Sequence, residues 1–112
     1  MAREQLRQQT RRPAVDLHRR QRGLAVVDEA YCDYVEAPEY PDCLEFLRAG
    51  RNLAVLRTFS KIHGLAGLRI GYAVTVGEVA AALETVRSPF NTSVLAQAAA
   101  RAALEDAEHV AR

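Results

Sequence analysis

The stretch LAVLRTFSKIHGLAGLRIGYAV, residues 53–74, contains two apolar runs separated by a turn that includes glycine. Residues 53–57 and 69–74 are short and carry little polar surface, which is typical of strands buried in a sheet. Gly64 and Gly67 supply the backbone freedom that the chain needs in order to turn back. The stretch therefore predicts two strands, joined by a loop that carries polar side chains.

The rest of the chain extends this pattern of apolar runs. Residues 24–28, LAVVD, are rich in valine and end in an acid, which predicts another buried strand of a parallel sheet. Three helices are also predicted, at residues 42–50, 77–87 and 92–112. Gly50 is expected to close the first helix, and Thr92 or Asn91 to cap the last. Buried strands between alanine-rich helices predict an α/β fold with a mostly parallel sheet.

The composition of the chain changes at Gly23. Residues 1–22 are rich in arginine and glutamine, hold seven of the fourteen arginines and are interrupted by Pro13. Because they show no sustained apolar stripe, we expect a disordered, solvated arm followed by the folded part, residues 23–112. The arm has no aromatic residue for stacking and no recognisable reading motif, so nucleic acid is not expected as a partner.

The whole chain has 112 residues, 49% of them hydrophobic, and a formal net charge of +1. This length allows one domain or part of one. No apolar run approaches the roughly 20 residues of a membrane helix, and there is no secretory signal, so we expect a cytoplasmic protein. The spacing of Cys32, Cys43 and His63 fits no usual zinc site, and no metal is expected.

Polar residues follow the predicted strands at the edge where α/β sheets bind ligands. Asp28 ends the first strand, while Thr58, Ser60 and Lys61 come at the end of the second. Position alone favours a simple turn-capping role for Asp28, and Tyr31, three residues later, gives no stronger signal by itself. If the two strands are parallel, however, all of these side chains meet at one edge of the sheet.

Arg69 lies beyond the glycine-containing turn, which can return it towards Lys61. Two hydroxyls and a guanidinium are donors that suit a phosphate dianion. Residues 64–67, GLAG, lack the Gly-x-x-x-x-Gly-Lys-Ser/Thr order of a triphosphate-binding loop, so ATP and GTP are not expected. Thr58, Ser60 and Arg69 therefore predict a site for a phosphate group on another ligand.

Lys61 is the only lysine in a chain with fourteen arginines. A lysine that arginine cannot replace is one that forms a carbon–nitrogen bond, because only an amine can become a Schiff base. Combined with a phosphate site, a carboxylate and a phenol, this lysine predicts pyridoxal 5'-phosphate (PLP) as the cofactor. Asp28 would keep the pyridine nitrogen protonated, and Tyr31 would donate a hydrogen bond to the phenolic oxygen of the ring.

The lysine would also move a proton. Its ordinary pKa of about 10.4 keeps the amine protonated at neutral pH. Desolvation and the like charge of Arg69 and the cofactor are expected to lower the pKa of Lys61 until it acts as a base. A base at this position could carry the proton between the substrate's α-carbon and the cofactor, which is the central step of transamination.

Three motifs carry a resemblance to a known family, VVDEAY at 26–31, LRTFSKIHGLAGLRIGY at 56–72 and VRSPFN at 86–91. Together they resemble the fold-type I PLP-dependent aminotransferases, and most of all the histidinol-phosphate aminotransferase branch. The resemblance covers about residues 23–108. It implies Lys61 as the Schiff-base lysine, Asp28 as the partner of the pyridine nitrogen and Tyr31 as the phenolate partner. The phosphate-binding residues that it implies are Thr58, Ser60 and Arg69.

The resemblance also implies an architecture and a reaction. The chain would be the central part of a three-layer α/β/α large domain, truncated at both ends, and residues 1–22 would not be homologous to the family. Amino transfer would link glutamate and 2-oxoglutarate with imidazole-acetol phosphate and histidinol phosphate, in histidine biosynthesis. Family members are homodimers. Their small domain, which grips the substrate carboxylate, has no counterpart among these motifs.

Three functions stay open on the sequence. The first is the aminotransferase. The second is another PLP chemistry on the same residues, such as decarboxylation of a phosphorylated amino acid or transamination of another amino acid. The third is a non-catalytic remnant. In this case a piece of a parallel sheet, which leaves strand edges and apolar faces exposed, would on its own be partly unfolded or aggregated and inactive.

Overall fold

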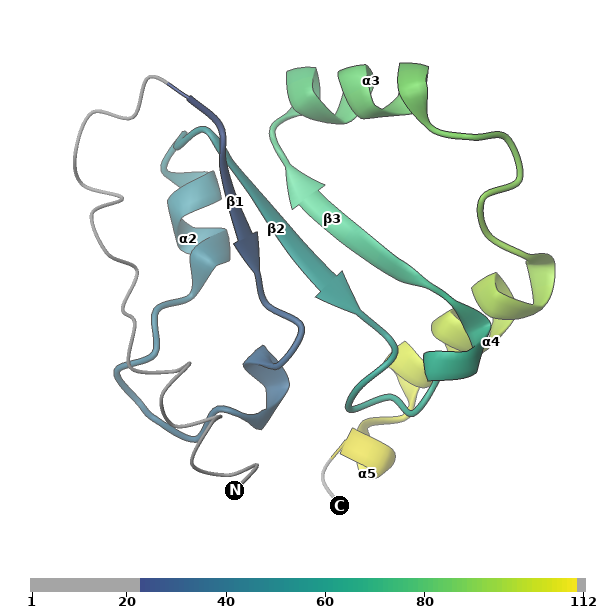
Figure 1. Cartoon of the computed structure of the whole chain (residues 1–112). Coiled ribbons are helices and arrows are strands. Elements are labelled where there is room, and N and C mark those ends of the chain that lie inside the picture. The colour runs from purple at the N-terminus through teal and green to yellow at the C-terminus, as the bar shows by residue number, and fades with distance from the viewer. Residues whose placement is uncertain (1–22, 111–112) are drawn as a thin grey trace.

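The computed structural model of the chain describes residues 23–110, and the arm predicted at residues 1–22 lies outside them. Within the described range, a sheet of three strands forms the centre of the fold, in the order β1 (Ala25–Asp28), β2 (Leu53–Thr58) and β3 (Gly71–Thr75) (Figure 1). The fold is completed by two short 3-10 helices, Cys32–Tyr34 and Ala66–Leu68, and by the helices α2 (Cys43–Arg48), α3 (Gly77–Val86), α4 (Val94–Glu105) and α5 (Ala107–Val110). The α/β fold class is confirmed.

The first two strands are parallel. β1, Ala25–Asp28, pairs with β2, Leu53–Thr58, in a register that places Asp28 opposite Leu56. Their carboxyl ends therefore meet at one edge of the sheet, as the apolar runs predicted.

The third strand, β3, Gly71–Thr75, runs antiparallel to β2 and makes the sheet mixed. The short connection through residues 59–70 returns the chain directly beside the end of β2, so that Gly71 lies opposite Thr58. A parallel strand would need a longer crossover to reach the other end of the sheet.

Glycine is required at two places in this return. A Cβ atom on Gly71 would lie 2.8 Å from the carbonyl oxygen of Arg57, and Gly64 has a φ of +68°. Gly67 lies in the same turn, but it has no positive φ and no neighbour within 4 Å of the position a Cβ atom would take, so the expectation that the turn needs its backbone freedom is wrong. The other left-handed residue of this loop is Arg69, with a φ of 52°.

One face of the sheet is covered by helix α2, Cys43–Arg48. Asp42 caps this helix by accepting a hydrogen bond from the amide of Leu44, and Gly50 follows its end with a φ of 77°. The core on this side consists of Cys43, Leu53 and Val55, with Ala25, Val27, Leu44, Phe46 and Leu47 packed against it. On the opposite face Val26 is 60% exposed, which agrees with the expectation of an uncovered apolar face.

The remaining helices are α3, Gly77–Val86, α4, Val94–Glu105, and α5, Ala107–Val110. Ser93, rather than Thr92 or Asn91, caps α4, because its hydroxyl accepts a hydrogen bond from the amide of Ala96. The single helix predicted to the end of the chain is divided at Asp106, whose carboxylate accepts a hydrogen bond from the amide of His109. Among the described residues, no helix has the length and apolar character that crossing a membrane requires.

Candidate functional site

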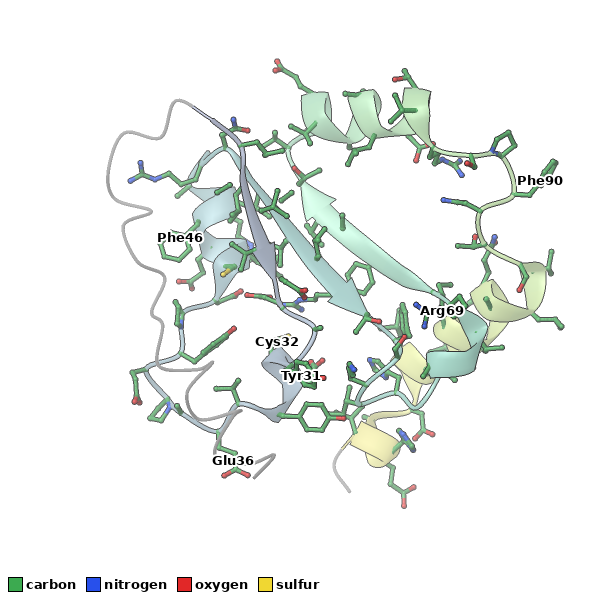
Figure 2. The ribbon with its side chains drawn as sticks, in the orientation of Figure 1. Tyr31, Cys32, Glu36, Phe46, Arg69 and Phe90 are labelled. Carbon is green, nitrogen blue, oxygen red and sulfur yellow. The ribbon has the colours of Figure 1, made fainter. Side chains whose placement is uncertain are left out.

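The carboxyl ends of β1 and β2 and the loop before β3 surround a hollow of about 300 Å³. The residues that line it are Asp28, Ala30, Leu56, Arg57, Thr58, Ser60, Lys61 and Arg69. Five of the six side chains predicted from the sequence are therefore gathered in one place. The sixth, Tyr31, lies beside it. Figure 2 shows Tyr31 in the turn after β1 and Arg69 in the loop before β3.

Asp28 is exposed at the end of β1, and its Oδ1 accepts a hydrogen bond of 3.0 Å from the amide of Ala30. This bond is the turn-capping role that its position in the sequence favoured. Asp28 also lines the hollow. Capping holds Asp28 at the end of the strand, so the two roles are compatible.

Lys61 is exposed, and its Nζ lies 4.9 Å from the centroid of the Tyr31 ring. A cation over the face of a tyrosine ring is attracted by the electrons of the ring. The interaction with the Tyr31 hydroxyl raises the pKa of Lys61, with a smaller contribution from Tyr34. The expectation of a lowered pKa is therefore wrong for the chain without a ligand, because Tyr31 stabilises the charged form of Lys61 by more than desolvation disfavours it.

The predicted phosphate donors come from both ends of the loop. The Thr58 hydroxyl accepts a hydrogen bond of 3.0 Å from the amide of Ser60, which fixes the first turn after β2. Nη1 of Arg69 donates a hydrogen bond of 2.9 Å to the carbonyl oxygen of Ala66. The backbone of Arg69 is left-handed. This conformation is uncommon in residues other than glycine and is often found at functional sites.

The chemistry of this donor set fits PLP. A carboxylate suits a protonated pyridine nitrogen, an amine suits an aldehyde, and two hydroxyls with a guanidinium suit a phosphate. All of these groups line the same hollow and are exposed or half-buried, so a ligand can reach them. The residues present can therefore hold the cofactor.

Sequence reasoning missed the ion pair between Glu29 and Arg57. Glu29 is 3% exposed, and its Oε2 accepts hydrogen bonds from Nε of Arg57 at 3.1 Å and from Nη2 at 2.8 Å. Burial lowers the pKa of Arg57, but its interactions with Glu29, Cys32 and Tyr72 together outweigh burial, and the net shift is upward. The available signal was positional, because each partner is the immediate neighbour in sequence of a predicted site residue.

Parallel strands whose carboxyl ends bring a carboxylate, an amine, two hydroxyls and a guanidinium to one hollow have the arrangement of a ligand-binding α/β domain. Residues 7–112 match the family described as "Aminotransferase class I and II", and the chain belongs to this family.

Individual relatives agree with this assignment. The chain is 59% identical over 90 residues to the histidinol-phosphate aminotransferase of Moorella thermoacetica, covering 80% of this chain and 23% of that protein. It is 58% identical over 87 residues to the corresponding enzyme of Brevibacillus brevis, covering 78% of this chain and 24% of that protein. The chain thus spans about a quarter of the length of the curated relatives that it matches.

Solved structures show the same fold. The histidinol-phosphate aminotransferase of Sinorhizobium meliloti in complex with pyridoxal-5'-phosphate matches with a TM-score of 0.70 and 41% identity, covering 78% of this chain and 23% of that chain. A putative histidinol-phosphate aminotransferase from Erwinia carotovora atroseptica matches with a TM-score of 0.73 and 32% identity, covering 79% and 26% of the two chains.

The contact between Lys61 and Tyr31 predicts a change in the pH dependence of lysine reactivity. In Tyr31→Phe the hydroxyl that raises the pKa of Lys61 is lost, so the amine becomes unprotonated at lower pH than in the parent chain. Acetylation of Lys61, followed by mass spectrometry as a function of pH, measures this shift. Tyr34→Phe is the matched control and should give a smaller shift in the same direction. Equal shifts in the two variants, or none, would contradict the assignment.

Proposed function

We propose that the chain supplies the cofactor-anchoring part of a PLP-dependent aminotransferase that interconverts histidinol phosphate and imidazole-acetol phosphate. The observation that carries this proposal is the meeting of Lys61, Asp28 and the phosphate donors in one hollow. The identity to histidinol-phosphate aminotransferases supports the choice of substrate.

Each side chain has a physical task in this proposal. When bound, PLP supplies an aldehyde that bonds to an amine and a ring that accepts electrons from the substrate's α-carbon. Asp28 pairs with the pyridine nitrogen, and Tyr31 donates a hydrogen bond to the phenolic oxygen. Lys61 provides the amine that anchors the cofactor. Thr58, Ser60 and Arg69 hold the phosphate and so fix the position of the ring.

Lys61 would have a second task when its amine is free. The Nζ amine would accept a proton from the substrate's α-carbon and return it on the side of the cofactor. Because its pKa is raised in the chain without a ligand, the amine needs desolvation and the nearby positive charge of Arg69 to act as a base. Over the full cycle an amino group passes from glutamate to imidazole-acetol phosphate, giving 2-oxoglutarate and histidinol phosphate with no net oxidation.

The setting of the reaction is also part of the proposal. Its partners are a small-molecule amino donor and a 2-oxo acid, and the working assembly is a homodimer in the cytoplasm. Cys32 and Cys43 are both free thiols, which supports a reducing compartment.

Cofactor binding is tested by mixing the purified chain with PLP, reducing with borohydride, digesting and measuring the pyridoxyl mass on the peptide that contains Lys61. Reduction makes the carbon–nitrogen bond permanent, and the single lysine leaves the N-terminal amine as the only competing amine. We expect about one label per chain on Lys61 at low PLP. Label confined to the N-terminal amine would refute the proposed site in this chain.

The substrate is tested with the PLP-loaded protein, glutamate and imidazole-acetol phosphate. Formation of 2-oxoglutarate and histidinol phosphate in equal amounts is the expected result. Release of carbon dioxide from a phosphorylated amino acid, without formation of 2-oxoglutarate, would instead assign a decarboxylase.

A further inference from the structure

An ion pair between Glu29, which is buried, and Arg57, which also lines the hollow, lies at the edge of the proposed cofactor site. The Glu29 side chain is 1% exposed and that of Arg57 is 25% exposed, and two hydrogen bonds join them. The pair joins the end of β1 to the end of β2. The amide of Glu29 also continues the backbone pairing of the two strands, because it donates a hydrogen bond of 2.9 Å to the carbonyl oxygen of Leu56. It is therefore the last link between the two strands before the chain enters the site.

Each member of the ion pair is next in sequence to a residue of the proposed site. Asp28 precedes Glu29, and Thr58 follows Arg57. Because successive side chains of a strand point to opposite faces, Glu29 points to the face covered by α2 when Asp28 points to the other. Any movement of one member of the pair is thus transmitted to a site residue through a single peptide unit.

Further contacts extend from the pair to the loop that carries Lys61. Burial and the neighbouring Glu29 carboxylate raise the pKa of the Cys43 thiol to about 12, so the thiol stays neutral beside the carboxylate. The side chain of Tyr72 on β3 in turn contributes to the raised pKa of Arg57.

Ring contacts continue this network. The ring of Tyr72 lies 5.6 Å from that of Phe59, and the ring of Phe59 lies 5.1 Å from that of His63, measured between centroids. Phe59 and His63 each stand two residues from Lys61, one on either side. The network therefore reaches all three strands and both flanks of the lysine.

We propose that Glu29 and Arg57 are a positioning pair that sets the separation between Asp28 on β1 and the Thr58 to Lys61 segment after β2. The inference rests on the proposed function, in which these two groups hold opposite ends of one rigid ligand. A ligand gripped from two strands tolerates little change in their spacing. Removing one partner leaves a buried charge without compensation, and the strand ends must then separate to hydrate it.

The test compares Arg57→Gln with Val55→Ala in the PLP trapping experiment. Val55 is fully buried on the same strand but away from the hollow, so its truncation weakens the fold without breaking the pair. For each variant, labelling of Lys61 is measured against PLP concentration at a temperature where circular dichroism shows the folded chain. Arg57→Lys is included because it keeps the charge and loses the two-pronged geometry, and label on Lys61 is counted apart from label on the introduced lysine.

We expect Arg57→Gln to raise the PLP concentration for half-maximal labelling at least about tenfold, with full labelling at saturation. Arg57→Lys should give a smaller rise in the same direction, and it decides the matter if Arg57→Gln does not fold. Val55→Ala should stay within about twofold of the parent chain. An unchanged concentration in the Arg57 variants, or an equal rise in Val55→Ala, would overturn the inference.

Hydrogen exchange of the unliganded protein separates this inference from the proposed function. The amides of Glu29 and Phe59, which are hydrogen-bonded to Leu56 and Ile70, report whether the strand ends stay closed. If the parent chain takes no label, the proposed function fails in this chain, and the exchange result decides alone. Faster exchange of these amides in Arg57→Gln than in Val55→Ala supports the positioning pair, and equal exchange refutes it.

Discussion

Replacing Lys61 with arginine is expected to abolish pyridoxyl labelling of the chain at every position except the N-terminal amine. The guanidinium keeps the positive charge near Tyr31 but stays protonated and cannot bond to an aldehyde carbon. Since Lys61 is exposed, the substitution should leave the fold intact. A loss of label without a change in the circular dichroism spectrum would therefore report chemistry and not stability.

A matched control asks whether any exposed lysine would take the label. Arg101 on α4 has a side chain that is 86% exposed and does not line the proposed site, so Arg101→Lys in the Lys61→Arg background restores the number of lysines away from that hollow. We expect this double variant to stay unlabelled at low PLP, as measured on the same digest. Stoichiometric label on the introduced lysine would show that exposure alone accounts for the reaction.

Gly71→Ala is expected to destabilise the chain by about 1–3 kcal/mol, because the new methyl group overlaps the strand beside it. The added Cβ would lie 2.8 Å from the carbonyl oxygen of Arg57, a backbone atom that cannot move without disturbing the pairing of β2 with β3. The free energy of unfolding in urea measures the effect. The same variant should weaken PLP labelling, since Arg57 is followed directly by Thr58.

Gly67→Ala is the matched control. This glycine lies in the same loop, has no positive φ, and no atom lies within 4 Å of the position that an added Cβ would take. Alanine there should be neutral or should stabilise by about 0.4–1 kcal/mol through the lower entropy of the unfolded chain. If both substitutions had the same effect, the close approach at Gly71 would not be the reason.

Much of the sheet could be predicted because apolar runs of β1 and β2 carry the pattern of buried parallel strands. Their parallel pairing was enough to bring Asp28 and Lys61 to one edge. The direction of β3 could not be read in this way, since a short apolar run has the same composition in either direction. The cap of α4 was missed for a related reason, because Asn91, Thr92 and Ser93 are all good capping residues and the path of the preceding loop selects one of them.

The site was predictable in its members and less so in its electrostatics. Residue types and their order pointed to the lysine, the carboxylate and the phosphate donors, whose roles stay predictions until a ligand is bound. The raised pKa of Lys61 depends on the position of one tyrosine hydroxyl, which the sequence does not supply. The Glu29–Arg57 pair likewise requires the register of two strands that are separated by a loop and a helix.

The left-handed backbone of Arg69 has a consequence for how this loop balances stability against recognition. An arginine with a φ of 52° occupies a conformation that glycine would adopt without steric penalty. Glycine, however, has no guanidinium with which to hold an anion. The loop thus keeps an unfavourable backbone conformation at the position whose guanidinium is proposed to hold the phosphate, and contacts with a bound phosphate would offset the free-energy cost of that conformation.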